Sequence, residues 1–539
     1  MRGFLQRLGT FGDVTASGFL VGITAMVNFV SMLVFARTLG PDIFGLFSTC
    51  RRLVAFVAPL VNFGGHLGVS RYLGYYTGDS RRRSAVLASA LLLCLIALPL
   101  TMAFFLPLEA LGKNVGWVRG LSPSLWTATA ALTATTAAGL LVFSTLRGLG
   151  NPQVANTHQL FVLTSYLGIA LSSSQVPVER LLSLLAVSTL ILNLAFLGWA
   201  LWWHRSTLRL PSPRQLGSAV KQLGRYSLPR LADGPLQASL NLICILLAPA
   251  IGGLALSGYI HISQTIVRVS EVLIVPLSVI FLPLVARQLR EGQMDRLARQ
   301  AQLIYDSIVL IGCFLVIQSI VWAPVLLNTA FGSRYSEAMP FLLVTLPSIL
   351  PFLLFASFRS FIDGYSVRPV NSLHLLAASC LVLVLGLSIG KLMDGLGISI
   401  GYTAAMVLLG VLSVRYVARH FGVRVWSAHV VTSLLLALVC GGLGLLIRTL
   451  GGTLGSVQVL AVFATAEIGL TALLLVLAWR LRHAAVVFAI SRLRSARAAT
   501  PGVEIPPSSA TGKPLACVSE SGRAGIVSRA VASTSLRET

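Results

Sequence analysis

The stretch VTASGFLVGITAMVNFVSMLVFARTLGPDIFGLFSTCRRLVAFVAPLV, residues 14–61, contains two apolar runs separated by a short turn at residues 36–43. A helix that crosses the hydrocarbon core of a bilayer needs roughly 20 mostly apolar residues. Both runs approach that length. The stretch therefore predicts two membrane-spanning helices joined by a tight turn.

The same pattern continues along the chain and predicts an all-α, polytopic membrane protein. Of the 539 residues, 55% are hydrophobic and 11% are charged, and the mean hydropathy is +0.84. A soluble domain has about 25% charged residues, so the composition excludes a water-soluble enzyme, a disordered chain and a fibrous one. Windows of spanning length give about 14 candidates, which start near residues 14, 44, 84, 124, 155, 181, 226, 255, 302, 340, 372, 398, 427 and 456.

The basic residues predict the orientation of these spans. The chain has 41 Lys+Arg and 17 Asp+Glu, a net charge of +24, which in a soluble protein would indicate nucleic-acid binding. Here most basic residues fall in every second short loop, as expected when basic loops stay in the cytoplasm. The pattern predicts that both termini are cytoplasmic and that nucleic acid is not a partner.

The turn at residues 36–43 has a weak counterpart later in the chain, which predicts an internal duplication. ARTLGPDI before FGLF resembles APAIGGLAL before SGYI, and each following run ends in a basic loop. Transporters are often built from repeated halves with the binding site between them. We therefore predict two six-helix lobes at residues 1–203 and 226–420, a cytoplasmic linker at 204–225, two additional spans within 426–480, and a disordered tail at 498–539.

Three arginines lie two or three helical turns inside the predicted spans. Arg51 and Arg52 are in the second span and Arg268 is in the eighth. An arginine at mid-helix costs about 2.5–3.5 kcal/mol on insertion scales, so such residues usually face an aqueous cavity or a partner. The guanidinium group donates paired hydrogen bonds to phosphate oxygens and stays charged in a dry site. The three residues are therefore candidates for binding a diphosphate or an acidic sugar.

The duplication predicts that these arginines meet. Aligning Gly45 with Gly258 puts Arg268 opposite Ala55, which is one helical turn beyond the arginines of the second span and on their face. The alternative for that pair is that the side chains reach the nearby membrane surface. The alternative for Arg268 is an ion pair with Glu271.

Other polar residues in the apolar windows have two interpretations each. The amides of Gln264 and Asn241 are candidates for binding sugar hydroxyls or for joining neighbouring helices. Spacings of three or four residues favour ion pairs within a helix, with substrate access or coupling as the alternative. The residues so spaced are Arg359 with Asp363 and Arg230 with Asp233. Lone histidines such as His261 are expected to bond to a neighbouring helix.

Several short segments carry a family resemblance. They are Ala36–Pro41 (ARTLGP) followed by FGLF, Phe331–Ala338 (FGSRYSEA) and Gly395–Ile398 (GLGI). In order and spacing these resemble turns of the polysaccharide flippases (Wzx type) of the multidrug/oligosaccharidyl-lipid/polysaccharide (MOP) exporter superfamily. The resemblance covers about residues 10–425, and Asp363–Pro369 matches the corresponding family loop only loosely.

The resemblance implies a transporter of the bacterial inner membrane. Its substrate would be a polyprenyl-diphosphate-linked oligosaccharide, moved outward by alternating access for assembly of a surface polysaccharide. Membrane lipid, a polysaccharide polymerase and glycosyltransferases are the implied partners.

Two alternatives remain at the level of sequence. A cation-coupled multidrug exporter of the same superfamily needs embedded carboxylates, and Glu271 and Glu467 are the few candidates. A polytopic glycosyltransferase or ligase is the enzymatic alternative, although the phosphate-loop, HExxH and CxxC motifs are absent. The cysteines have no disulfide or zinc spacing. We therefore predict a transporter of an anionic substrate, without catalytic activity, metal or cofactor.

Overall fold

The computed structural model is helical wherever it describes regular structure, and it contains no strand in those residues. It describes residues 2–76, 79–112, 122–205, 211–270, 285, 288–289, 291–366, 369–450 and 456–480. Residues 1–488 form one unit. Glu271 and the predicted tail at 498–539 lie outside the described residues.

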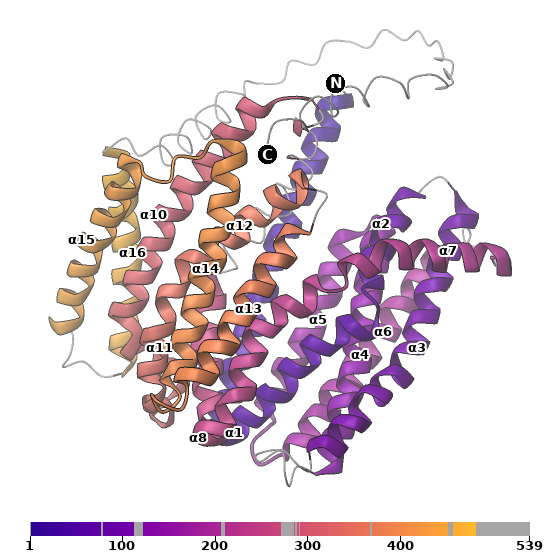
Figure 1. Ribbon diagram of the computed structural model, residues 1–539, viewed down its shortest axis with the longest axis horizontal. Helices are drawn as coiled ribbons and strands as arrows, with labels where there is room; N and C mark the ends of the chain where they lie inside the picture. The colour runs from indigo at the N-terminus through magenta and orange to yellow at the C-terminus, as the bar shows by residue number, and fades with distance from the viewer. Residues whose placement is uncertain are drawn as a thin grey trace, which may run out of the picture. The chain divides into compact units, whose positions relative to one another are not determined.

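The helices follow one another with short connections (Figure 1). Their bounds are α1 Arg2–Val61, α2 Gly65–Tyr75, α3 Ser80–Gly112, α4 Pro123–Gly148, α5 Pro152–Leu171, α6 Val178–Trp203, α7 Pro213–Ser227, η2 Leu228–Arg230, α8 Asp233–Val269, α10 Met294–Leu326, η4 Leu327–Phe331, η5 Ser333–Ala338, α11 Met339–Thr345, η6 Leu346–Ser348, α12 Ile349–Tyr365, α13 Val370–Ile389, α14 Leu396–Phe421, α15 Ala428–Leu450 and α16 Ser456–Arg480.

The long helices α1 and α8 each contain two predicted spans joined at a glycine. Gly40 interrupts α1 with φ +74°, and Gly253 interrupts α8 with φ +76°. Backbone with positive φ favours glycine because a Cβ atom clashes there. The two kinks therefore occupy the positions of the two predicted turns.

The two long helices cross where two glycines let their backbones touch. A Cβ built on Gly45 would lie 1.9 Å from the Leu254 carbonyl oxygen, and one built on Gly258 would lie 2.5 Å from the Pro41 carbonyl oxygen. Each carbonyl belongs to the residue that follows its helix's kink glycine, so the contacts are reciprocal. This confirms the predicted alignment of Gly45 with Gly258 and the symmetry of the repeat at the crossing.

The other helices pack in two groups (Figure 1). In the first, α1 contacts α4 and α5, α4 contacts α3 and α6, and α7 lies on α2 and α3. In the second, α8 contacts α13 and α11, α12 contacts α14, and α10 contacts α12 and α15. Among the helix contacts between the groups, those of α1 with α8 are the most extensive.

The all-α, polytopic fold is confirmed. In the part of the chain described, 10 helices are long and apolar enough to cross a membrane, and the two kinked ones hold two predicted spans each. The total of 14 spans, their orientation and the lobe boundaries stay predictions. The predicted linker differs in structure: α7 is an amphipathic helix with a capping box between Ser212 and Gln215. As a result α8 begins at Asp233, later than the predicted start near residue 226. Pro235 lies in its first turn, where the missing backbone N–H of a proline is tolerated.

Candidate functional site

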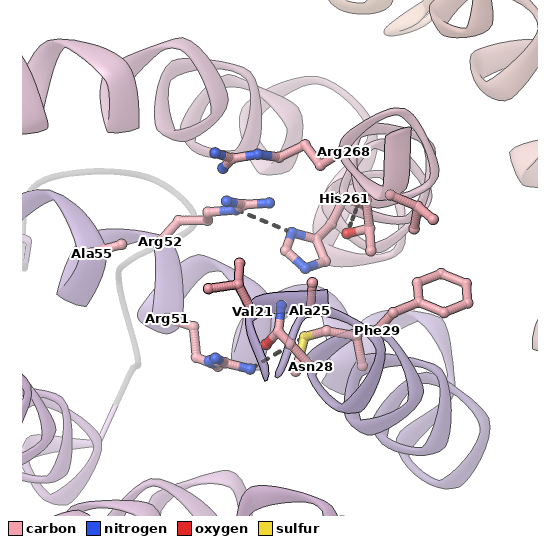
Figure 2. Close-up of a pocket in the computed structure, with 12 residues that line it drawn as sticks. Val21, Ala25, Asn28, Phe29, Arg51, Arg52, Ala55, His261 and Arg268 are labelled. Atoms are coloured by element: carbon pink, nitrogen blue, oxygen red, sulfur yellow. Dashed lines mark hydrogen bonds between the residues drawn. The ribbon is translucent and has the colours of Figure 1, made fainter. Parts of the chain in front are cut away.

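A cavity of about 350 Å³ lies between α1 and α8 (Figure 2). Both halves of α1 and the second half of α8 contribute side chains, and among the described lining residues there is no carboxylate. The lining residues are Val21, Ala25, Asn28, Phe29, Met32, Arg51, Arg52, Ala55, His261, Thr265, Arg268 and Val269. The three predicted arginines and Ala55 therefore meet at one site, as the repeat alignment predicts.

Arg52 and Arg268 extend side by side from the two helices (Figure 2). The Nε of Arg52 donates a hydrogen bond to His261 Nδ1 over 3.4 Å. Because Nδ1 accepts, this histidine presents a lone pair and not a second positive charge to the arginine. The bond joins α1 to α8, as expected for His261.

Arg51 points away from the other two arginines (Figure 2). Its Nη1 donates to the Met32 sulfur over 3.2 Å, and its guanidinium lies 5.3 Å from the ring centre of Tyr166 and 5.9 Å from that of Phe47. In the described residues no carboxylate pairs with Arg51 or Arg52. Desolvated cations without a counterion are costly, so the site favours an anionic ligand that supplies the missing charge.

The predicted amide residues lie elsewhere. Gln264 and Asn241 are buried in α8, with 1% and 3% of their surface exposed, and neither lines the cavity. Glu467, on α16, contacts Trp322 and is also away from the cavity. Conversely, Asn28 lines the cavity although it was not among the predicted site residues. An amide inside an apolar run was a usable signal for it.

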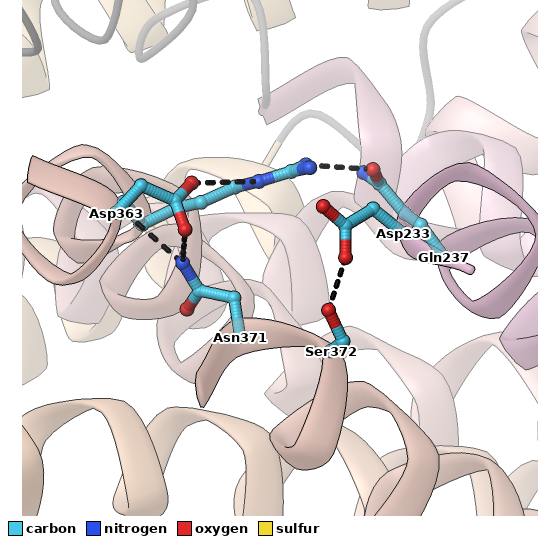
Figure 3. A network of polar contacts seen from close by, with 6 residues as sticks. Asp233, Gln237, Asp363, Asn371 and Ser372 are labelled. Atoms are coloured by element: carbon cyan, nitrogen blue, oxygen red, sulfur yellow. Dashed lines mark hydrogen bonds and ion pairs between the residues drawn. The ribbon is translucent and has the colours of Figure 1, made fainter. Parts of the chain in front are cut away.

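Arg359 and Asp363 form a polar network at one end of α12 (Figure 3). Arg359 pairs with Asp363 at 3.8 Å, as the i, i+4 spacing predicts, and also donates to Gln237 of α8 over 2.8 Å. Asn371 of α13 donates to Asp363 over 2.6 Å. The network therefore ties α8, α12 and α13 together.

Arg230 and Asp233 have separate partners. Arg230 lies 4.3 Å from the ring centre of Tyr226 and donates to that residue's carbonyl oxygen over 3.3 Å. Asp233 accepts a hydrogen bond from Ser372 of α13 (Figure 3). Neither residue lines the central cavity. In the described residues no group of three or more His, Cys, Asp or Glu side chains is placed to hold a metal ion.

A second contact surface closes the end of the helix crossing that the charge pattern predicts to face outward. Tyr335 of η5 donates its hydroxyl to the Ala36 carbonyl oxygen over 2.8 Å, and its ring meets Phe44 edge-on at 6.4 Å. Arg37 donates to the Thr329 carbonyl oxygen. We call these contacts the α1–η5 seal. Its tyrosine belongs to the segment FGSRYSEA that the resemblance had singled out.

Removing the tyrosine hydroxyl should loosen this seal. We expect Tyr335→Phe to destabilise the closed seal by about 1 kcal/mol, the contribution of one hydrogen bond. The fraction of molecules in which the seal is open should then rise about fivefold. In a cysteine-free background carrying Ala36→Cys, a water-soluble maleimide should label the buried thiol correspondingly faster. Tyr365→Phe, which removes a tyrosine hydroxyl outside the seal, is the control. Equal labelling of both variants would contradict a sealing role for Tyr335.

With this geometry in place, the chain can be set beside known proteins. A family model described as polysaccharide biosynthesis protein matches residues 13–115, and no curated protein matches. An inward-facing multidrug resistance MATE family transporter of the MOP superfamily has a TM-score of 0.62 at 14% identity, over 74% of this chain and 94% of its own. The lipid II flippase MurJ, inward closed, has a TM-score of 0.61 at 10% identity, over 85% and 98%.

A MOP superfamily transporter from Pyrococcus furiosus, whose binding pocket has reverse polarity, has a TM-score of 0.55 at 14% identity, over 76% of this chain and 95% of its own. The chain has the fold of the MOP exporter superfamily. The polysaccharide biosynthesis model agrees with the resemblance to the polysaccharide flippases, and it matches the part of the chain that contains Arg51 and Arg52. The three solved structures named above are described as transporters or as a flippase.

Proposed function

We propose that the protein is a flippase that moves a polyprenyl-diphosphate-linked oligosaccharide, the substrate class that the family resemblance implies, across the bacterial inner membrane. The observation that carries this proposal is the central cavity, which is lined by Arg51, Arg52 and Arg268 and by no carboxylate in the described residues. Two arginine side chains that approach from opposite helices match the paired oxygens of a diphosphate.

The rival function, export of cationic drugs, fits this cavity less well. A cation would meet three guanidinium groups there and no described carboxylate to attract it. Glu467 contacts Trp322 at a distance from the cavity lining. The charge at the site therefore favours the anionic head group over a cationic drug.

The transport cycle we propose is alternating access. The head group enters from the basic cytoplasmic side and binds the arginines while the α1–η5 seal is closed. The two helix groups then move about the Gly45–Gly258 crossing, the seal opens, and the glycan leaves while the polyprenyl chain stays in lipid. A polymerase and glycosyltransferases would act on the product and supply the substrate.

Ligand binding to the purified protein tests the charge preference directly. We expect farnesyl diphosphate to bind and the lipophilic cation tetraphenylphosphonium not to bind. Arg268→Gln should weaken farnesyl diphosphate binding at least tenfold, because a hydrogen bond between charged groups contributes about 1.5–3 kcal/mol. Arg205→Gln, which removes an exposed arginine beside Trp202, is the control. Binding of the cation without binding of the diphosphate would replace this proposal with drug export.

A further inference from the structure

A second pocket lies inside the first helix group, beside the central cavity. It has a volume of about 310 Å³, and α1, α4, α5 and α6 line it. Arg51 and Ala55 line both this pocket and the central cavity. The polar lining residues are Arg51, Thr136, His158, Gln159, Tyr166, Thr189 and Asn193. We call it the α4–α6 pocket.

Several of these polar groups have hydrogen-bonding capacity that the described residues leave unused. The Nδ1 atom of His158, a residue that is 97% buried, has no hydrogen-bond partner there. The side chains of the half-buried Thr136 and the exposed Gln159 also have none among the described residues. A polar group without a partner in a membrane-embedded pocket costs free energy. These polar groups can bind the hydroxyls of a ligand, while the apolar lining residues, such as Leu132 and Phe143, can pack against its carbon atoms.

The hydrogen bonds around Asn193 determine which hydrogens are available. Its Nδ2 donates to the Thr135 carbonyl oxygen over 2.9 Å, which leaves its Oδ1 facing His158 Nε2 at 2.9 Å. Because an amide oxygen only accepts, Nε2 carries the proton and Nδ1 keeps a lone pair. His158 thus has an acceptor to offer, while the Gln159 amide and the Thr136 hydroxyl each both donate and accept.

Arg51 connects this pocket with the diphosphate site. Its guanidinium lies 5.3 Å from the ring centre of Tyr166, which is held by a 2.9 Å hydrogen bond to Thr189. Arg52 and Arg268 extend together, and Arg51 points away from them (Figure 2). Arg51 is the arginine that also lines the α4–α6 pocket. A ligand bound by all three arginines would continue from the central cavity into this pocket.

We propose that the α4–α6 pocket binds the sugar ring attached to the diphosphate, an inference that rests on the proposed function. The sugar hydroxyls bond to Gln159, Thr136 and the free Nδ1 of His158, and the Tyr166 ring lines the sugar site. Arg51 binds oxygens at the junction between sugar and phosphate. The first helix group then recognises the first sugar of the glycan, and the α4–α6 pocket selects among carrier-linked substrates.

The test compares four ligands on the purified full-length protein by isothermal titration. They are farnesyl diphosphate and its conjugates with glucose, galactose or N-acetylglucosamine. At least one conjugate should bind about tenfold more tightly than farnesyl diphosphate, the gain expected from about two hydrogen bonds. In the double variant Gln159→Leu with Thr136→Val, that conjugate should bind no more tightly than farnesyl diphosphate.

The control is Thr157→Val, which removes a hydroxyl from the same helix but outside the pocket; it should keep the tenfold gain. If farnesyl diphosphate binds but no conjugate exceeds it, or if the gain survives in the double variant, the sugar site is overturned and the flippase proposal stands. If farnesyl diphosphate itself does not bind, the proposed function fails and this inference fails with it. The thermal midpoint of each variant shows whether it is folded.

Discussion

Replacing Arg52 and Arg268 together by glutamine should reduce transport by about 100-fold or more. Each guanidinium would contribute about 1.5–3 kcal/mol to a charged hydrogen bond with the diphosphate, and a factor of 100 corresponds to about 2.7 kcal/mol. The measurement is movement of the head group of a fluorescent polyprenyl diphosphate from one leaflet to the other, in proteoliposomes that contain equal amounts of each variant.

The stability of the single variant Arg52→Gln separates a binding role of this residue from a structural one. In the cavity the charge of Arg268 disfavours that of Arg52, and no carboxylate pairs with Arg52 in the described residues. Without ligand the removal of the Arg52 charge should therefore leave the thermal midpoint unchanged or raise it, as is common for residues that serve binding at the expense of stability. A lower midpoint with a matching loss of folded protein would indicate that Arg52 holds the structure together.

Arg82→Gln is the matched control for transport. Arg82 is exposed and pairs with Asp79 at 3.3 Å on the surface, where such a pair contributes little. It should transport at the wild-type rate. Transport by the Arg52/Arg268 double variant above a tenth of the wild-type rate, at normal abundance and folding, would contradict the cationic-cavity proposal.

Adding a single methyl group at the helix crossing should prevent the two long helices from packing. In Gly45→Ala the new Cβ would lie 1.9 Å from the Leu254 carbonyl oxygen, and in Gly258→Ala it would lie 2.5 Å from that of Pro41. Both obstacles are backbone atoms, which cannot rotate away as a side chain can. We expect a loss of several kcal/mol of stability, the scale of severe overpacking.

The yield of monodisperse protein and its thermal midpoint measure this effect. Gly22→Ala is the control within α1, because a Cβ at Gly22 meets no atom within 4 Å. Alanine in a helix is favoured over glycine by about 0.5–1 kcal/mol, so this variant should be neutral or slightly stabilised. Equal behaviour of Gly45→Ala and Gly22→Ala would show that the crossing opens without cost.

The cationic cavity was predictable because it depends on periodicity. The number of residues from Gly45 to Arg52, and from Gly258 to Arg268, fixes the face of the helix on which each arginine lies. These spacings are local properties of two helices. A duplicated sequence transfers one helix face onto the other, so the alignment alone predicts that the arginines share a site. The same reasoning predicts the ion pair of Arg359 with Asp363.

The neighbours of each helix face were not predictable in the same way. Arg51 and Arg52 are adjacent in sequence and point about 100° apart around the helix. Both line the central cavity, but only Arg51 also lines the α4–α6 pocket. Gln264 is on the same helix as Arg268 but is turned into the packed interior. Polarity inside an apolar run indicates that a side chain needs a partner, but it does not indicate which partner it has.

The amino-acid sequence was enough to predict the membrane class, the all-α fold, the turns within residues 36–43 and 248–256 and the arginines within the spans. These depend on length, hydropathy and helical repeat, which are local along the chain. The folded protein was needed to show that backbones touch at Gly45 and Gly258, that Tyr335 closes the crossing and that Arg51 lines the α4–α6 pocket. Each of these features joins segments far apart in sequence, and close packing selects their contacts from many that hydropathy alone permits.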